Sequence, residues 1–413
     1  EANAAGLAVV AGAAGGTIEA VEDGDTGLLV DGNDPQQIAD AISFLLDEPE
    51  TRARMAATGR TRARQRDWAG AARALTRRLD RPRRVFDEPS PSYAEGKMLP
   101  AALPDEPGKP RLLVTIDCEE CFDWRHRRAE GWRLAGLDAL ATLHRRIAAC
   151  GLAPLYLATR PVLEDADWCA FLDEVADRGE AACGIHDHPW LTPPLFEVPN
   201  AWNSYPCNLP GHLERRKIAS LAELFAQRFG HAPIAHRAGR WGGSARTAEL
   251  LEEFAIPLDC SPAAFQPPTT DGGPDHRTIT NRPFLAGRQE KVLVVPAAGL
   301  VWPRGPDPLA RRLPAFGPAA KPQRFTPEIH PLSRLLAMAE RIERAGEPFV
   351  CLSLHSSSLV AGGNPYAPDP DSAGRILERT VALVEHLVKT RGWRPVTATG
   401  LARIANDRGG GAG

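Results

Sequence analysis

The feature that most constrains this fold is a regular alternation of strand-like and helix-like segments from Arg111 to about residue 404. Short apolar runs are each followed by a stretch whose apolar residues recur at helical spacing. Parallel strands joined by helices produce this pattern, and six or seven such units favour a closed barrel over an open sheet. We therefore predict an α/β fold with a distorted (β/α)7-type barrel over residues 111–404. The predicted strands are 112–116, 154–158, 181–185, 234–237, 257–260, 292–296, 349–354 and 394–398.

The first predicted strand ends in a cluster of acids. These are Asp117, Glu119, Glu120 and Asp123. A buried carboxylate needs a metal, a cation or hydrogen bonds to replace its lost hydration. Three later strand-like runs end in histidine or arginine, in the stretches 184–189, 236–240 and 352–355. Because α/β folds keep their chemistry at the carboxyl ends of strands, these residues predict a functional cleft there.

Residues 1–80 form a separate block. A strand at 7–11, a glycine turn, a strand at 26–30 and a helix that begins after Asp34 predict half of a doubly wound nucleotide-binding domain. We interpret this block as an N-terminal half-Rossmann lobe. Residues 81–110 are rich in proline and predict an extended linker, and residues 405–413 predict a flexible tail.

The bulk composition excludes several partners. A formal net charge of -3 over 413 residues indicates no overall electrostatic attraction to nucleic acid or to an anionic membrane. No run of 18 apolar residues is present, so no transmembrane segment is predicted. The 8 cysteines are scattered, which indicates a reducing, cytoplasmic compartment, and we interpret Cys118 and Cys121 as packing residues. The chain begins without methionine, so we expect the natural chain to start further upstream.

Residues 1–80 resemble the C-terminal end of retaining GT-B glycosyltransferases. The matching runs are Glu1-Ala2, 6–10, Gly15-Gly16, 27–30 and Asp67-Trp68. The resemblance implies that Glu1 contacts the ribose of a nucleotide-sugar donor. The acceptor half of that family would lie upstream, so the resemblance implies glycosyl transfer only in a longer parent chain.

Residues 111–404 resemble the NodB-homology polysaccharide deacetylases, in particular their WalW-like branch. The matching runs are Thr115-Ile116-Asp117-Cys118-Glu119-Glu120, 184–190, 203–210, 237–242 and 353–359. The resemblance implies a hydrolase that removes N-acetyl groups from a sugar in a cell-surface polysaccharide or its lipid-linked precursor. Such an activity belongs to cell-envelope biosynthesis.

The resemblance also implies roles for individual residues. Glu119, His186 and His188 would hold a divalent metal, with zinc as the default ion for such donors. The implied acid–base groups are Asp117 as base, Arg237 as its ion-pair partner, His355 as acid and Asp259 as the residue that orients His355. Trp190, Arg240 and Trp241 are the predicted substrate contacts, although Arg240 and Arg304 could equally cap loops rather than bind an anionic glycan.

Two departures from the family pattern leave alternatives open. Cys118 separates acids that are usually adjacent, and the two histidines are two residues apart rather than four. These changes permit a metal-independent amidohydrolase on the same fold. A noncatalytic glycan-binding domain attached to a glycosyltransferase is the third interpretation.

Overall fold

The computed structural model describes residues 1–14, 16–65, 92–96, 98–101, 109–124, 131–302 and 321–407. The chain forms two compact units, residues 1–88 and 89–413, and each is described by itself. Most of the predicted linker, Arg304 and residues 408–413 of the predicted tail lie outside the described residues. No helix among these residues is both long enough and apolar enough to span a bilayer.

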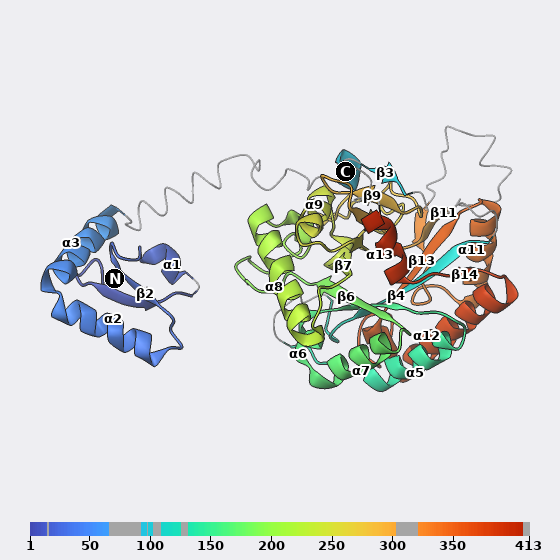
Figure 1. Ribbon diagram of the computed structural model, residues 1–413, viewed down its shortest axis with the longest axis horizontal. Coiled ribbons are helices and arrows are strands. Elements are labelled where there is room, and N and C mark those ends of the chain that lie inside the picture. Colours follow the sequence, from blue (N-terminus) through green and yellow to red (C-terminus); the bar gives the residue numbers. More distant parts are fainter. Residues whose placement is uncertain are drawn as a thin grey trace. The chain divides into compact units, whose positions relative to one another are not determined.

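Unit 1 is a small parallel α/β structure. Its described strands β1 (Val9–Gly12) and β2 (Gly27–Val30) pair in parallel. The helices are α1 (Thr17–Ala20), α2 (Pro35–Asp47) and α3 (Pro49–Gln65). The Asp34 side chain caps α2 by accepting hydrogen bonds from the backbone N–H groups of Gln36 and Gln37. This arrangement agrees with the predicted half-Rossmann lobe (Figure 1).

Unit 2 is built on a sheet whose main run is parallel. The described parallel strands, in spatial order, are β13 (Phe349–His355), β4 (Arg111–Cys118), β5 (Leu155–Ala158), β6 (Ala182–Asp187), β7 (Ala235–Ala238), β8 (Leu258–Asp259) and β10 (Val292–Val294). Antiparallel β9 (Phe284–Ala286) and β3 (Leu99–Pro100) extend the sheet beyond β10, and β14 (Arg394–Pro395) pairs with β4. A separate antiparallel hairpin, β11 (Gly299–Trp302) and β12 (Lys321–Arg324), was not predicted from the sequence.

Helices lie around the outside of this sheet (Figure 1). They are α5 (Leu137–Ala148), α6 (Arg160–Glu164), α7 (Ala166–Asp177), α8 (Gly211–Phe229), α9 (Ala245–Glu253), α11 (Leu332–Arg344) and α12 (Pro370–Glu385). Helix α13 (Ala398–Asp407) instead packs against the inner face of the sheet through Ala398, Leu401 and Ala402. Alternate residues of β4 contribute to different cores, as the period of two in a strand requires. Leu112 and Val114 pack in the cluster that contains the outer helices α5 to α12, whereas Leu113 belongs to an inner cluster.

The inner cluster shows that the sheet curves around a common interior. It contains one face of every parallel strand, through Leu113, Leu157, Ala182, Ala235, Leu258, Leu293 and Cys351. The two ends of the parallel run also approach each other, because the backbone N–H of Ala298, just beyond β10, donates a hydrogen bond of 2.8 Å to the carbonyl of Cys351. Both observations agree with the predicted seven-stranded α/β architecture.

The described residues 92–96 and 98–101, predicted as part of a linker, belong to unit 2 and pack against its sheet. Leu99–Pro100 pairs with β9. Tyr93, in the short 3-10 helix Tyr93–Glu95, is 1% exposed and its hydroxyl donates a hydrogen bond to the carboxylate of Asp259 on β8. The described part of this segment is therefore an element of the sheet unit.

Candidate active site

The alternation of side chains along β4 places Asp117 on the inner face of the sheet. Because Leu113 faces the inner cluster, Thr115 and Asp117 face the same way, and Glu119 follows them beyond the strand end. The carboxyl ends of β4, β6, β7 and β13 surround a cavity of about 250 Å³. Its lining includes Asp117, Glu119, His186, His188, Arg237 and His355.

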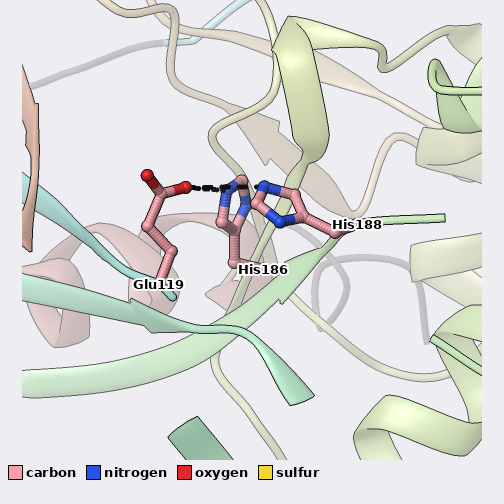
Figure 2. Close-up of side chains that lie close together, drawn as sticks. All are labelled: Glu119, His186 and His188. Atoms are coloured by element: carbon pink, nitrogen blue, oxygen red, sulfur yellow. Dashed lines mark ion pairs between the residues drawn. The ribbon is translucent and has the colours of Figure 1, made fainter. Parts of the chain in front are cut away.

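Glu119, His186 and His188 converge on one point of this cavity (Figure 2). Glu119 Oε2 lies 3.5 Å from His188 Nε2 and 3.8 Å from His186 Nε2, and all three ligand atoms lie within 4.8 Å of one another. All three residues are buried. The unusual spacing of the histidines has a simple cause, since residues two apart along an extended strand share one face.

The hydrogen bonds of the two imidazoles fit a metal site. Nδ1 of His186 lies 3.0 Å from the carbonyl oxygen of Arg237, and Nδ1 of His188 lies 2.9 Å from Glu120 Oε1. Glu120 also accepts a hydrogen bond from Thr159. Both Nε2 atoms are thereby directed at Glu119, and within the described residues neither forms a hydrogen bond. Two imidazole nitrogens held by outer partners, together with one carboxylate, could hold a divalent ion.

Asp117 is held as a carboxylate by Arg237. Arg237 is 1% exposed, and its Nη1 donates a hydrogen bond to Asp117 Oδ1. The remaining guanidinium donors reach Thr115 Oγ1 at 2.8 Å and the carbonyl of Cys260 at 2.8 Å. Burial alone would raise the pKa of Asp117, but the charge of Arg237, supported by His186 and His355, lowers it below its ordinary value.

His355 lies beside Asp117 because β13 and β4 are neighbours in the sheet. The two residues are register partners, and His355 Nε2 is 3.7 Å from Asp117 Oδ2. On the other side of the ring, Nδ1 lies 2.8 Å from Glu328 Oε1. Burial lowers the pKa of His355, but the charges of Glu328, Glu119 and Asp117 outweigh it and raise the pKa to about 9.

The predicted contact between Asp259 and His355 is wrong. Leu258 and Cys260 face the inner cluster, so Asp259 between them faces outward. Its carboxylate accepts hydrogen bonds from Tyr93 and from Ser261. Glu328, in the loop after β12, takes the position beside His355, and its place in a proline-rich loop gave no sequence signal.

Cys118 is not part of the acid cluster. Its side chain lies on the outer face of β4 and packs with Ile116 in the core between the sheet and the helices. Burial raises the pKa of its thiol well above the ordinary value. All eight cysteines are free.

Aromatic rings form the walls of the cavity. Trp190 stacks on His188 with ring centroids 4.4 Å apart, and Trp241 lies under the guanidinium of Arg237 at 5.1 Å. Arg240 also lines the cavity, but its Nη2 donates to Asp271 at 2.7 Å and its Nη1 to Ser204 Oγ at 2.6 Å. Its charge is therefore compensated within the protein, as expected of a residue that caps a loop.

The remaining predicted residue, Glu1, belongs to unit 1. It lines a hollow of about 510 Å³ in that unit together with Glu19 and Arg62.

Comparisons with known proteins cover the two units separately. Residues 1–62 match the family model "Glycosyl transferases group 1". A D-inositol 3-phosphate glycosyltransferase from Corynebacterium efficiens is 49% identical over 76 residues, which are 18% of this chain and 18% of that protein. The chain thus spans about 18% of the length of this curated relative.

Solved structures resemble a larger share of the chain. A Mycobacterium smegmatis crystal structure described as a polysaccharide deacetylase is 15% identical with a TM-score of 0.42, covering 78% of this chain and 96% of the other. A 4-alpha-glucanotransferase from Thermococcus litoralis is 9% identical with a TM-score of 0.43, covering 71% of this chain and 40% of the other. Because both TM-scores lie below 0.5, neither assigns an activity to this chain.

Proposed function

We propose that unit 2 is a metal-dependent carbohydrate deacetylase that hydrolyses the N-acetyl amide of a sugar in a cell-surface polysaccharide or its lipid-linked precursor. The observation that carries this proposal is the convergence, in one cavity, of the Asp117 carboxylate, the His355 imidazole and a group of three residues that could hold a metal ion. The motif resemblance of residues 111–404 points to the same reaction. The glycosyltransferase match of residues 1–62 supports a carbohydrate context for the whole protein.

In this mechanism, Glu119, His186 and His188 would hold a divalent ion, with zinc as the default for this donor set, and the bound ion would supply Lewis acidity toward the acetyl carbonyl and the attacking water. Asp117 accepts a proton from that water as the water oxygen bonds to the acetyl carbon. Arg237 keeps Asp117 ionised and fixes its orientation.

The acid step uses His355. As the bond between the acetyl carbon and the nitrogen breaks, His355 Nε2 donates its proton to the departing nitrogen, and acetate and the free amine result. Glu328 at Nδ1 keeps the ring oriented so that Nε2 faces the reacting atoms. Trp190 and Trp241 offer apolar faces on which a sugar ring can stack.

The test is acetate release from N-acetylated oligosaccharides. We expect Asp117→Asn to lose about 10²–10⁴-fold in rate, the usual contribution of a general base. Arg282→Gln, at an exposed residue outside the cavity, is the matched control. Activity of Asp117→Asn near that of the parent protein would reject the assignment, and full activity after metal removal would favour the metal-independent alternative.

For unit 1 we propose a role only within a longer parent chain. There, Glu1 would contact the ribose of a nucleotide-sugar donor, as the family resemblance implies. Donor binding by the parent protein and by its Glu1→Gln variant tests this role, and equal affinity would contradict it.

A further inference from the structure

Three arginines line the cavity, and they differ in how their charges are compensated. Arg237 is paired with Asp117, and Arg240 with Asp271. For Arg324, at the end of β12, the described residues place no carboxylate within ion-pair distance. The cavity wall therefore carries one guanidinium whose charge the described protein does not neutralise directly.

The side chain of Arg324 is held by aromatic rings and one hydrogen bond. Its guanidinium carbon lies 5.6 Å from the ring centroid of Trp241 and 5.9 Å from that of Tyr366. Its Nη2 donates to the Tyr366 hydroxyl at 2.5 Å. A guanidinium has five N–H donors, so most remain for a ligand, and the flat group is already oriented for a bidentate contact.

Glu328 does not supply the missing partner. Its charge acts on Arg324 at longer range. Its carboxylate accepts hydrogen bonds from the backbone N–H and Nδ1 of His355 and from the hydroxyls of Ser358 and Thr326. Because four donors already bond to this carboxylate, it orients His355 and does not pair with Arg324.

Strand pairing and a hydrogen bond hold the backbone at Arg324. Arg324 is the register partner of Gly299 in the β11–β12 hairpin. The next residue, Phe325, is 1% exposed, and its N–H donates to the carbonyl of Ala298 at 2.8 Å. An arginine on such a support loses little further freedom when it binds a ligand.

Arg324 lies on the His355 side of the cavity. Tyr366, its hydrogen-bond partner, stacks near His355 with ring centroids 6.4 Å apart, and Trp124 lies 5.3 Å from both rings. In the proposed reaction His355 protonates the departing nitrogen, so the sugar that bears this nitrogen occupies the same side.

From these contacts we infer that Arg324 is a specificity determinant that selects substrates carrying an anionic group, a carboxylate or a phosphate, on the N-acetylated sugar or its neighbour. This inference rests on the proposed deacetylase function. Planar, oriented guanidinium groups recognise both anions by paired hydrogen bonds.

The experiment compares three N-acetylhexosamine disaccharides: one neutral, one with a uronate carboxylate and one with a phosphate monoester. We expect kcat/KM for at least one anionic sugar to exceed that for the neutral sugar by about 10- to 100-fold, the range of a hydrogen bond to a charged group. Arg324→Gln should abolish this preference, so that the ratio of kcat/KM for the anionic sugar to kcat/KM for the neutral sugar falls to about one. Arg324→Lys should retain part of the preference, and added salt should weaken it.

Arg282→Gln is the control for loss of a surface arginine, and thermal melting checks that each variant is folded. Equal kcat/KM for all three sugars, or an anion preference that persists in Arg324→Gln, would overturn the inference. Calorimetric titration with the same sugars measures binding, and so tests the role of Arg324 independently of hydrolysis. If no sugar is hydrolysed, the proposed function fails, while tighter binding of an anionic sugar by the parent protein than by Arg324→Gln still supports the role of Arg324, and equal binding contradicts it.

Discussion

Glu328 Oε1 accepts two hydrogen bonds from one residue, from the backbone N–H of His355 at 2.9 Å and from its Nδ1 at 2.8 Å. The first fixes the position of the carboxylate and the second fixes the ring. A buried carboxylate fixed in this way raises the pKa of the imidazole, and Glu119 and Asp117 add to the effect, which brings it to about 9.

This pairing predicts the alkaline limb of activity. His355 is protonated below its raised pKa, so the acid form that the proposed reaction requires is lost as pH rises through about 9. Glu328→Gln removes the largest charge that raises this pKa, and the limb should move to lower pH. Profiles of kcat/KM against pH for both proteins measure the shift. Glu340→Gln, at an exposed residue of α11, is the control, and coincident limbs in parent and Glu328→Gln would refute the pairing.

Changes at Asp259 and its partner Tyr93 should affect stability but not the pH profile of activity. Tyr93→Phe leaves one buried oxygen of Asp259 without its donor, which should lower the free energy of unfolding by about 1–3 kcal/mol. Because Asp259 does not touch His355, the alkaline limb should stay in place in both Tyr93→Phe and Asp259→Asn. Chemical denaturation and the same pH profiles check this pair of outcomes. A displaced limb in a folded Asp259→Asn protein would restore the role that the family resemblance implies.

The proposed metal site of Glu119, His186 and His188 predicts a defined number of metal ions per chain. We expect about one zinc ion per chain by elemental analysis, and substantially less in Glu119→Gln and in His188→Ala, because three ligands are the usual protein share of a catalytic zinc site. His231→Ala removes an exposed histidine outside the site and should keep the full metal content. Unchanged metal in the two site variants would place the ion elsewhere.

Glu343 on α11 predicts a component of acid stability. It accepts hydrogen bonds from Arg391 and from Trp393 Nε1 at 2.6 Å, and these contacts, with Lys109, hold its pKa at about 2. The folded pKa lies below the unfolded value of 4.5, so the stabilisation is present above pH 4.5 and is lost as pH falls toward 2. Glu343→Gln should melt earlier at neutral pH, and its difference from the parent should shrink over this interval. A difference that is constant with pH would show that the charge contributes nothing.

Periodicity predicted most of the architecture. Each parallel strand has a counterpart among the predicted segments, because a buried strand with an amphipathic helix after it leaves a strong pattern. The family resemblance grouped Glu119, His186 and His188, and the structure brings their ligand atoms within 4.8 Å of one another.

Residues in irregular segments escaped prediction for a physical reason. Glu328 and Arg324 acquire their positions from a hairpin and a loop whose hydrogen bonds join distant parts of the chain, and local spacing carries no record of such contacts. The pairing of Asp259 with His355 rested on the family resemblance alone, and in the structure Tyr93 and Ser261 are the hydrogen-bond partners of Asp259.

Tyr93 has a consequence for how this protein can be divided. A fragment cut at Arg111, where the first long strand starts, would omit the tyrosine that satisfies Asp259 and the strand that pairs with β9. Such a fragment would expose an unprotected sheet edge and a carboxylate in need of water. The stretch before β4 is therefore not an interchangeable spacer, and a fragment that preserves this sheet unit must begin upstream of residue 92.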